Sequence, residues 1–224
     1  MLMARSAESR QRIIDYGEVF TPPGLVSDML DLVQNECERI ESRFLEPACG
    51  NGNFLVEVLR RKLLTVDKRN ARDPARWQRD AILSVSSLYG IDLQADNALV
   101  CRDRLLSVLS SAYETRFKEP LADAAVHSAA YILSKNILQG DALTLLMENG
   151  RPILFSEWTP INGQLLKRKT FVYKHLLDHA ENSSADTAPL FSELGEDVYF
   201  SKPIRDYPPC HYLKVADAEG PVSQ

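Results

Sequence analysis

The spacing of apolar residues predicts helices alternating with short buried strands over residues 24–140 of this 224-residue chain. Short apolar runs at 43–47, 88–92 and 136–140 indicate strands, and the segments between them have apolar residues at helical intervals of three and four. The predicted helices cover residues 23–41 with Pro23 in the first turn, 54–63, 77–88, 98–112 and 121–133. Such alternation is typical of a mostly parallel sheet with helices on both faces.

The pattern changes after Asp141. Residues 152–158 and 164–173 have the composition of extended strands, and the turn residues TPING lie between them. This arrangement predicts a hairpin instead of a fourth parallel strand, so we expect a truncated sheet followed by a C-terminal hairpin. We divide the chain into a flexible N-terminus at 1–16, an α/β domain at 17–180, and a loop with an irregular tail at 181–224.

Composition narrows the class of protein. The chain has 26 Lys and Arg against 31 Asp and Glu, a net charge of −5, and 45% hydrophobic residues. These values indicate one globular domain and exclude a polycationic binding mode. No apolar run approaches the roughly 18 residues of a membrane span. The four cysteines and four histidines lack disulfide or metal-site spacing, so we expect a cytoplasmic protein with no membrane partner and no metal.

Residues 44–55, FLEPACGNGNFL, contain the strongest chemical signal. An acidic residue ends a predicted strand, and Gly50 and Gly52 precede a predicted helix. Glycines let the backbone turn tightly and approach a ligand with no Cβ in the way, while the helix N-terminus presents free N–H groups. A site for a nucleoside-type ligand fits this pattern, and so does a simple tight connection between a strand and a helix.

The segment EPACGNGNF resembles the D/E-P-A-C-G-S-G-x-F motif of amino-group DNA methyltransferases, particularly the adenine-N6 enzymes and the methylation subunits of restriction-modification systems. Three further segments resemble motifs of this family in the same chain order: GEVFTPP at 17–23, YGIDL at 89–93 and NILQGDAL at 136–143. The resemblance covers about residues 17–145. It implies a Rossmann-like methyltransferase fold, S-adenosylmethionine as the cofactor and DNA as the substrate.

The resemblance also implies a role for each matching residue. Thr21 helps to bind the methionine carboxylate, Glu46 lies near the methionine end, and Asp92 accepts both ribose hydroxyls. Leu93 covers one face of the adenine, and Asp141 accepts a hydrogen bond from the adenine amino group. The remaining wall residues are Pro47, Ala48, Cys49, Gly50 and Gly52 from the glycine turn, with Ala142 beside Asp141.

Three of these residues also have ordinary structural explanations. Thr21 and Asp141 have the residue types of helix N-caps, the latter before a helix at 142–147, and Glu46 is placed to be a strand-end carboxylate facing solvent. Cys49 is not expected to act as a nucleophile. The cysteine of cytosine-C5 methyltransferases follows the fourth strand, whereas Cys49 belongs to the glycine turn.

The chain departs from the family at the catalytic motif. The family places D/N-P-P-Y/F/W after the fourth strand, where an oxygen accepts from the target amine and a ring stacks on the flipped base. At that distance this chain has WTPI, so the candidates are Trp158, Thr159 and Pro160, none of which is a carboxylate or carboxamide.

Two hypotheses follow from this departure. The first is a methyltransferase that transfers a methyl group to an exocyclic amine of DNA. The second is a catalytically silent cofactor-binding module that acts through a second protein subunit. The position of Trp158 and Thr159 separates them, because an enzyme needs them on the sulfonium side of the cofactor and a hairpin turned away from it favours the module.

Overall fold

Three short parallel strands and four long helices form the α/β part of the protein. The structure is a computed structural model that describes residues 21–175, 177 and 202–218. The strands β1 (Phe44–Glu46), β2 (Leu88–Asp92) and β3 (Ile137–Gln139) pair in the order β1-β2-β3. Glu46 lies opposite Gly90, and Asp92 lies opposite Gln139, so the three strands end at one edge. The predicted α/β architecture with a parallel sheet is confirmed.

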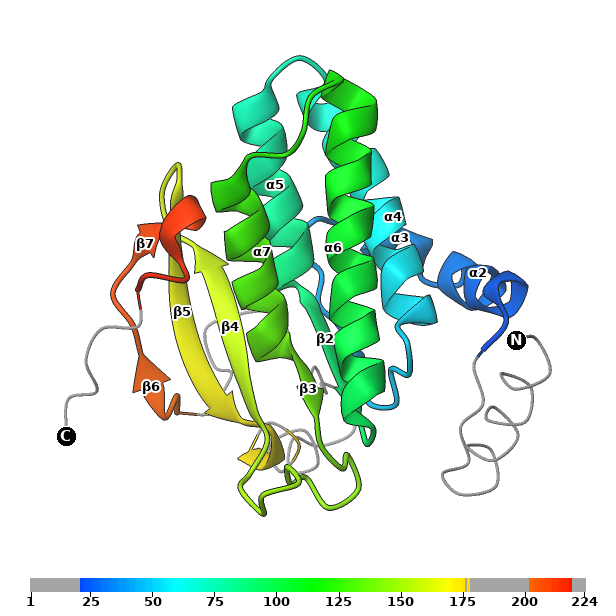
Figure 1. The fold of residues 1–224 in the computed structure, drawn as a ribbon, viewed down its shortest axis with the longest axis vertical. Coiled ribbons are helices and arrows are strands. Elements are labelled where there is room, and N and C mark those ends of the chain that lie inside the picture. Colours follow the sequence, from blue (N-terminus) through cyan, green and yellow to red (C-terminus); the bar gives the residue numbers. More distant parts are fainter. Residues whose placement is uncertain (1–20, 176, 178–201, 219–224) are drawn as a thin grey trace.

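The long helices are α4 (Asn53–Asn70), α5 (Pro74–Ser86), α6 (Ala95–Phe117) and α7 (Asp123–Asn136), and Figure 1 shows them side by side. Helix α5 is an extra element between α4 and β2, and it explains the long separation of the glycine turn from Asp92. Its Trp77 is fully buried, with its ring edge-to-face against Tyr113 of α6 at 5.4 Å between centroids.

The N-terminal helix is shorter than predicted. Instead of one helix over 23–41, the structure has α2 (Pro23–Asp31) and the single turn α3 (Gln34–Cys37). Val33 leaves the helical region at φ −123° and ψ 32°. The break turns Cys37 and Ile40 into the core, where both are buried, while Leu32 stays 86% exposed.

The two faces of the parallel sheet are covered by different elements. Leu88 and Ile137 pack among the helices, whereas Tyr89 and Ile91 point to the opposite face and pack with Phe155. The Tyr89 hydroxyl also donates to the Ser156 carbonyl at 3.2 Å. We expected helices on both faces. In the described residues, α4 to α7 cover one face. Phe155 of the hairpin covers the other, together with Tyr173 and Leu177 from the short helical segment that follows the hairpin.

The hairpin itself is confirmed. It consists of β4 (Leu154–Pro160) and β5 (Leu165–Val172), paired antiparallel, and Figure 1 shows it beside α7. Two short strands, β6 (Arg205–Asp206) and β7 (Cys210–His211), also pair with β5, and the 3-10 turn η1 (Tyr212–Lys214) follows them. Residues 202–218 of the predicted irregular tail are thus packed on the hairpin. The predicted flexible segment 1–16 and the loop at 181–189 lie outside the described residues.

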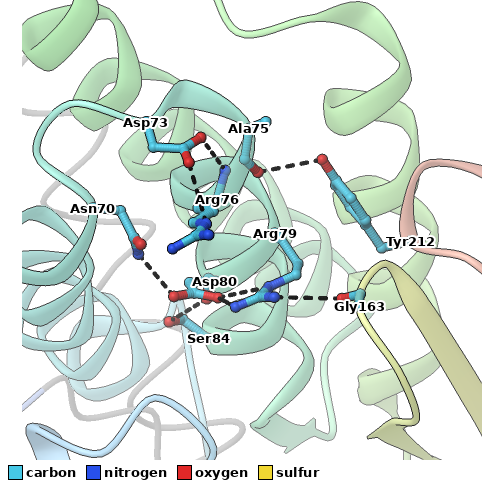
Figure 2. A network of polar contacts seen from close by, with 9 residues as sticks. All are labelled: Asn70, Asp73, Ala75, Arg76, Arg79, Asp80, Ser84, Gly163 and Tyr212. Atoms are coloured by element: carbon cyan, nitrogen blue, oxygen red, sulfur yellow. Dashed lines mark hydrogen bonds and ion pairs between the residues drawn. The ribbon is translucent and has the colours of Figure 1, made fainter.

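A polar network on α5 connects the turn of the hairpin and η1 to the helices (Figure 2). Asp80 accepts from the Asn70 amide at 2.7 Å and pairs with the Arg79 guanidinium at 2.7 Å. Arg79 also donates to the carbonyl of Gly163 in the hairpin turn at 3.4 Å, and the Tyr212 hydroxyl donates to the Ala75 carbonyl at 3.5 Å. Helix α5 therefore links the helical layer to the hairpin. None of the helices in the described part of the chain has the length and hydropathy needed to cross a membrane.

A buried lysine joins α4 to the segment that leads into β1. Lys62 is fully buried, and its ammonium group donates to the carbonyls of Arg39, Ile40 and Ser42 and to the Ser87 hydroxyl. Burial lowers the pKa of Lys62 to about 7. These carbonyls lie in a turn outside the helices and strands. Backbone carbonyls that are removed from water need hydrogen-bond donors, and the ammonium group of Lys62 supplies them.

We expect Lys62→Met to destabilise the fold. Methionine fills the space of the lysine stem but leaves three buried carbonyls without this donor, at a cost of about 1–3 kcal/mol for each that finds no other partner. Lys68→Met, an exposed position on the same helix, should change stability by about 0.5 kcal/mol or less. Urea unfolding of the three proteins checks this, and equal midpoints for the two variants would contradict it.

Candidate functional site

Residues 47–52 form a tight turn from β1 into α4. Gly50 and Gly52 have left-handed φ angles of 52° and 87°, which glycine adopts without steric cost. The Cys49 N–H donates to the Ile91 carbonyl at 2.8 Å, and the Gly52 N–H donates to the Cys49 carbonyl at 2.8 Å. The turn is thereby closed on itself and attached to β2.

Gly52 is required by packing between helices. A Cβ on Gly52 would lie 2.6 Å from Sγ and 3.2 Å from Cβ of Cys101, a buried residue of α6. We expected the absence of a side chain here to make room for a ligand. At this position that reasoning is corrected, because the missing side chain would point into α6.

Asp92 ends β2, and its carboxylate joins the glycine turn to α6. Its Oδ2 accepts from the Gly50 N–H at 2.8 Å. Its Oδ1 accepts from the Gln94 N–H at 2.9 Å and from the Asn97 amide at 3.1 Å. A carboxylate has about four lone-pair positions, so these contacts leave about one for a ligand hydroxyl. The expected bidentate contact with a ribose would require Asp92 to share or exchange a protein donor.

Asp141 lies next to Asp92 at the same edge, because the Gly140 N–H donates to the Asp92 carbonyl at 2.9 Å. Its Oδ1 accepts from the N–H groups of Leu143 at 2.8 Å and Thr144 at 3.3 Å, and these bonds lower the pKa of Asp141. The following residues form a turn instead of the helix considered at 142–147. The Thr144 hydroxyl also hydrogen-bonds to the Asp141 carboxylate. Its two oxygens have about four acceptor positions, so about one remains for a ligand donor.

Glu46 and Thr21 both precede the glycine turn in the sequence. Glu46 contacts the turn itself, and Thr21 contacts Asn53, the first residue of α4. Glu46 is partly buried, and its Oε1 accepts a long bond of 3.4 Å from the Ala48 N–H. Burial raises the pKa of Glu46. The Thr21 carbonyl accepts from the Asn53 amide at 3.0 Å, which places the predicted methionine-binding segment beside the turn. Residues 17–20 of that segment lie outside the described residues.

The remaining wall residues differ in exposure. Pro47 and Ala48 face solvent, Ala142 is partly buried, and Leu93 is 55% exposed after Asp92. Sequence reasoning did not identify Leu143, which is 94% exposed two residues after Asp141. The sequence contained a signal for Leu143, because it follows Asp141 after β3 much as Leu93 follows Asp92 at the end of β2. Exposed leucines beside two carboxylates suit a ligand with both apolar and hydrogen-bonding surfaces.

Cys49 of the glycine turn is buried. Its thiol lies against the thiol of Cys101, and this contact together with burial raises the pKa of Cys49. A protonated, buried thiol is a poor nucleophile. Within the described residues, no three side chains of His, Cys, Asp or Glu gather closely enough to bind a metal ion.

The structure does not bring Trp158, Thr159 and Pro160 to this edge. Trp158 is buried, and its indole N–H donates at 3.4 Å to Asn136, the last residue of α7. Because Asn136 directly precedes β3, this contact lies at the amino end of the sheet, opposite the glycine turn. Thr159 and Pro160 are exposed strand residues of the hairpin.

In comparisons with protein-family models, curated proteins and solved structures, no match to this chain was found. The residues and their arrangement therefore form the whole basis for a functional proposal.

We expect Gly52→Ala to destabilise the protein by roughly 1–2 kcal/mol for the left-handed backbone and a further 1–3 kcal/mol or so for overpacking against Cys101. Cys101→Ala in the same chain should recover part of the second loss. Gly24→Ala is the control, because a Cβ there meets no atom within 4 Å. Thermal unfolding measures all four proteins, and an unchanged midpoint for Gly52→Ala would show that the contact with α6 does not matter.

Proposed function

We propose that this chain binds S-adenosylmethionine at the carboxyl edge of β1, β2 and β3. The observation that supports this most strongly is the convergence of three acidic residues on that edge, Glu46, Asp92 and Asp141, one from each strand end, around a glycine turn closed by the Gly50–Asp92 hydrogen bond. Ligands of open parallel sheets bind outside the carboxyl ends of the strands. The motif order along the chain is the order in which the strands pair.

The side chains at this edge suit different parts of the cofactor. Glu46 and Thr21 fit the amino-acid part. Asp92 offers its remaining acceptor position to a ribose hydroxyl, and Leu93 offers an apolar surface to the adenine. Asp141 offers its remaining acceptor position to the adenine amino group. When bound, S-adenosylmethionine supplies an electrophilic methyl group on a sulfonium.

We expect calorimetric titration to detect S-adenosylmethionine binding, and Asp141→Asn to weaken it. Asparagine keeps one oxygen that can accept from Leu143 and Thr144, but the acceptor positions of the second oxygen are lost and a donor takes their place. Loss of this contact should cost about 1–3 kcal/mol, or roughly 5- to 150-fold in affinity. Glu148→Gln removes a charge at the same edge and is the matched control. Equal affinities for Asp141→Asn and the wild type would remove Asp141 from the site.

For the chemistry, the position of Trp158 favours the second hypothesis, a module that acts through a partner. Methyl transfer to an amine of DNA requires an oxygen acceptor and a stacking ring near the sulfonium. Trp158 packs at the amino end of the sheet, with the guanidinium of Arg168 5.4 Å from the centre of its ring. A second subunit of a restriction-modification type of assembly would then supply the acceptor and the DNA-recognition parts.

We expect the purified chain to bind the cofactor without transferring its methyl group to DNA. The measurement is incorporation of radiolabelled methyl into adenine-containing DNA, with an active adenine-N6 methyltransferase as the positive control. Transfer by the chain alone would support the first hypothesis and contradict the partner-dependent one. If Trp158→Ala abolished that transfer without unfolding the chain, the hairpin would belong to the active site.

A further inference from the structure

Arg104 of α6 is partly buried, and its guanidinium group donates hydrogen bonds to the glycine turn. Its Nη1 donates to the Asn51 carbonyl at 2.6 Å, to Asn51 Oδ1 at 2.8 Å and to Asn53 Oδ1 at 2.9 Å. Asn51 lies between Gly50 and Gly52. The backbone of glycine has more conformational freedom than that of any other residue type. Fixing such a segment costs conformational entropy, and a charged donor with three oxygen acceptors offsets part of that cost.

Asn53 extends this contact to the N-terminal segment. Arg104 can only donate hydrogen bonds, so the side-chain oxygen of Asn53 must face it, and the amide nitrogen then faces the other way. That nitrogen donates to the Thr21 carbonyl at 3.0 Å. The side chains of Arg104 and Asn53 thus connect α6, the glycine turn and Thr21 in one chain of hydrogen bonds.

We propose that Arg104 and Asn53 are positioning residues that hold the glycine turn and Thr21 together for the amino-acid part of S-adenosylmethionine. The proposal rests on the proposed function. The two segments that it joins, Thr21 and the turn beside Glu46, are the ones assigned to the methionine end. The adenosine end depends on Asp92 and Asp141, and neither of these carboxylates contacts Arg104 or Asn53.

The role of Arg104 differs from that of other arginines on α6. Arg116 donates to the Ala71 carbonyl at 2.6 Å, at the opposite end of the helix from the turn. Like Arg104, Arg116 donates to a backbone carbonyl, but this contact lies away from the candidate site. Arg116→Met serves as the matched control for Arg104→Met.

The experiment compares two ligands by calorimetric titration. S-adenosylmethionine contains both parts of the cofactor, and 5′-methylthioadenosine contains the adenosine and the sulfur but lacks the amino-acid part. Arg104→Met and Asn53→Ala should each lower the affinity for S-adenosylmethionine about 10-fold or more, the effect of one charge-assisted hydrogen bond. The affinity for 5′-methylthioadenosine should change less than about 2-fold, and Arg116→Met should bind both ligands as the wild type does.

The double variant tests whether the two residues act as one chain. Arg104→Met with Asn53→Ala should lose no more affinity than the weaker-binding single variant, because either change already breaks the chain of hydrogen bonds from α6 to Thr21. Losses that multiply would contradict the proposal. Equal losses for both ligands would show a general structural role and would also overturn it, as would full affinity in Asn53→Ala. Circular dichroism confirms folding, and Asn53→Ala provides the decisive result if Arg104→Met does not fold.

A wild-type chain that fails to bind S-adenosylmethionine would overturn the proposed function, and the positioning role with it. A wild-type chain that binds, with variants that bind equally well, would overturn only the positioning role.

Discussion

The carboxylate of Asp92 is the contact on which the rest of the candidate site depends. It accepts hydrogen bonds from the turn after β1, from the residue that precedes α6, and from Asn97 in the first turn of α6. A buried carboxylate is stable only when donors replace the water that it has lost. The glycine turn and the start of α6 are arranged to provide those donors, and Gly140 adds the end of β3 through the Asp92 carbonyl. One residue, through its side chain and its backbone carbonyl, therefore connects three strand ends.

The hairpin determines what the opposite end of the molecule can do. It packs Phe155 on the face of β2 that contains Tyr89 and Ile91, and it buries Trp158 against α7. Arg43, at the start of β1, forms an ion pair with Glu157 of the hairpin. These contacts stabilise the amino end of the sheet and keep the hairpin away from the carboxyl edge. The arrangement separates the candidate site from a structural end of the sheet, which is the physical basis for the proposed module that would bind cofactor without its own catalytic loop.

Much of the fold was predictable because its signals are local. The three strands, α4 to α7 and the antiparallel hairpin follow from apolar spacing and turn residues. The break between α2 and α3 was not predictable, since a continuous helical pattern runs through Val33. The conformation of residues 202–218 was also missed, because strands of two residues have no periodicity and form only where β5 offers a partner.

The sequence by itself determined the order of the motifs and the residue types at the strand ends, because strand length, glycine turns and apolar spacing depend on neighbouring residues. Only the tertiary structure decided what those residues contact. It showed that Gly52 is required by Cys101 of α6, that Asp92 already holds three protein donors, and that Trp158 faces away from the glycine turn. Arg104 and Asn53 became recognisable for the same reason. Arg104 and Asn53 contact residues that are distant in the sequence, partly through backbone atoms. These contacts form only when α6, the glycine turn and Thr21 pack together.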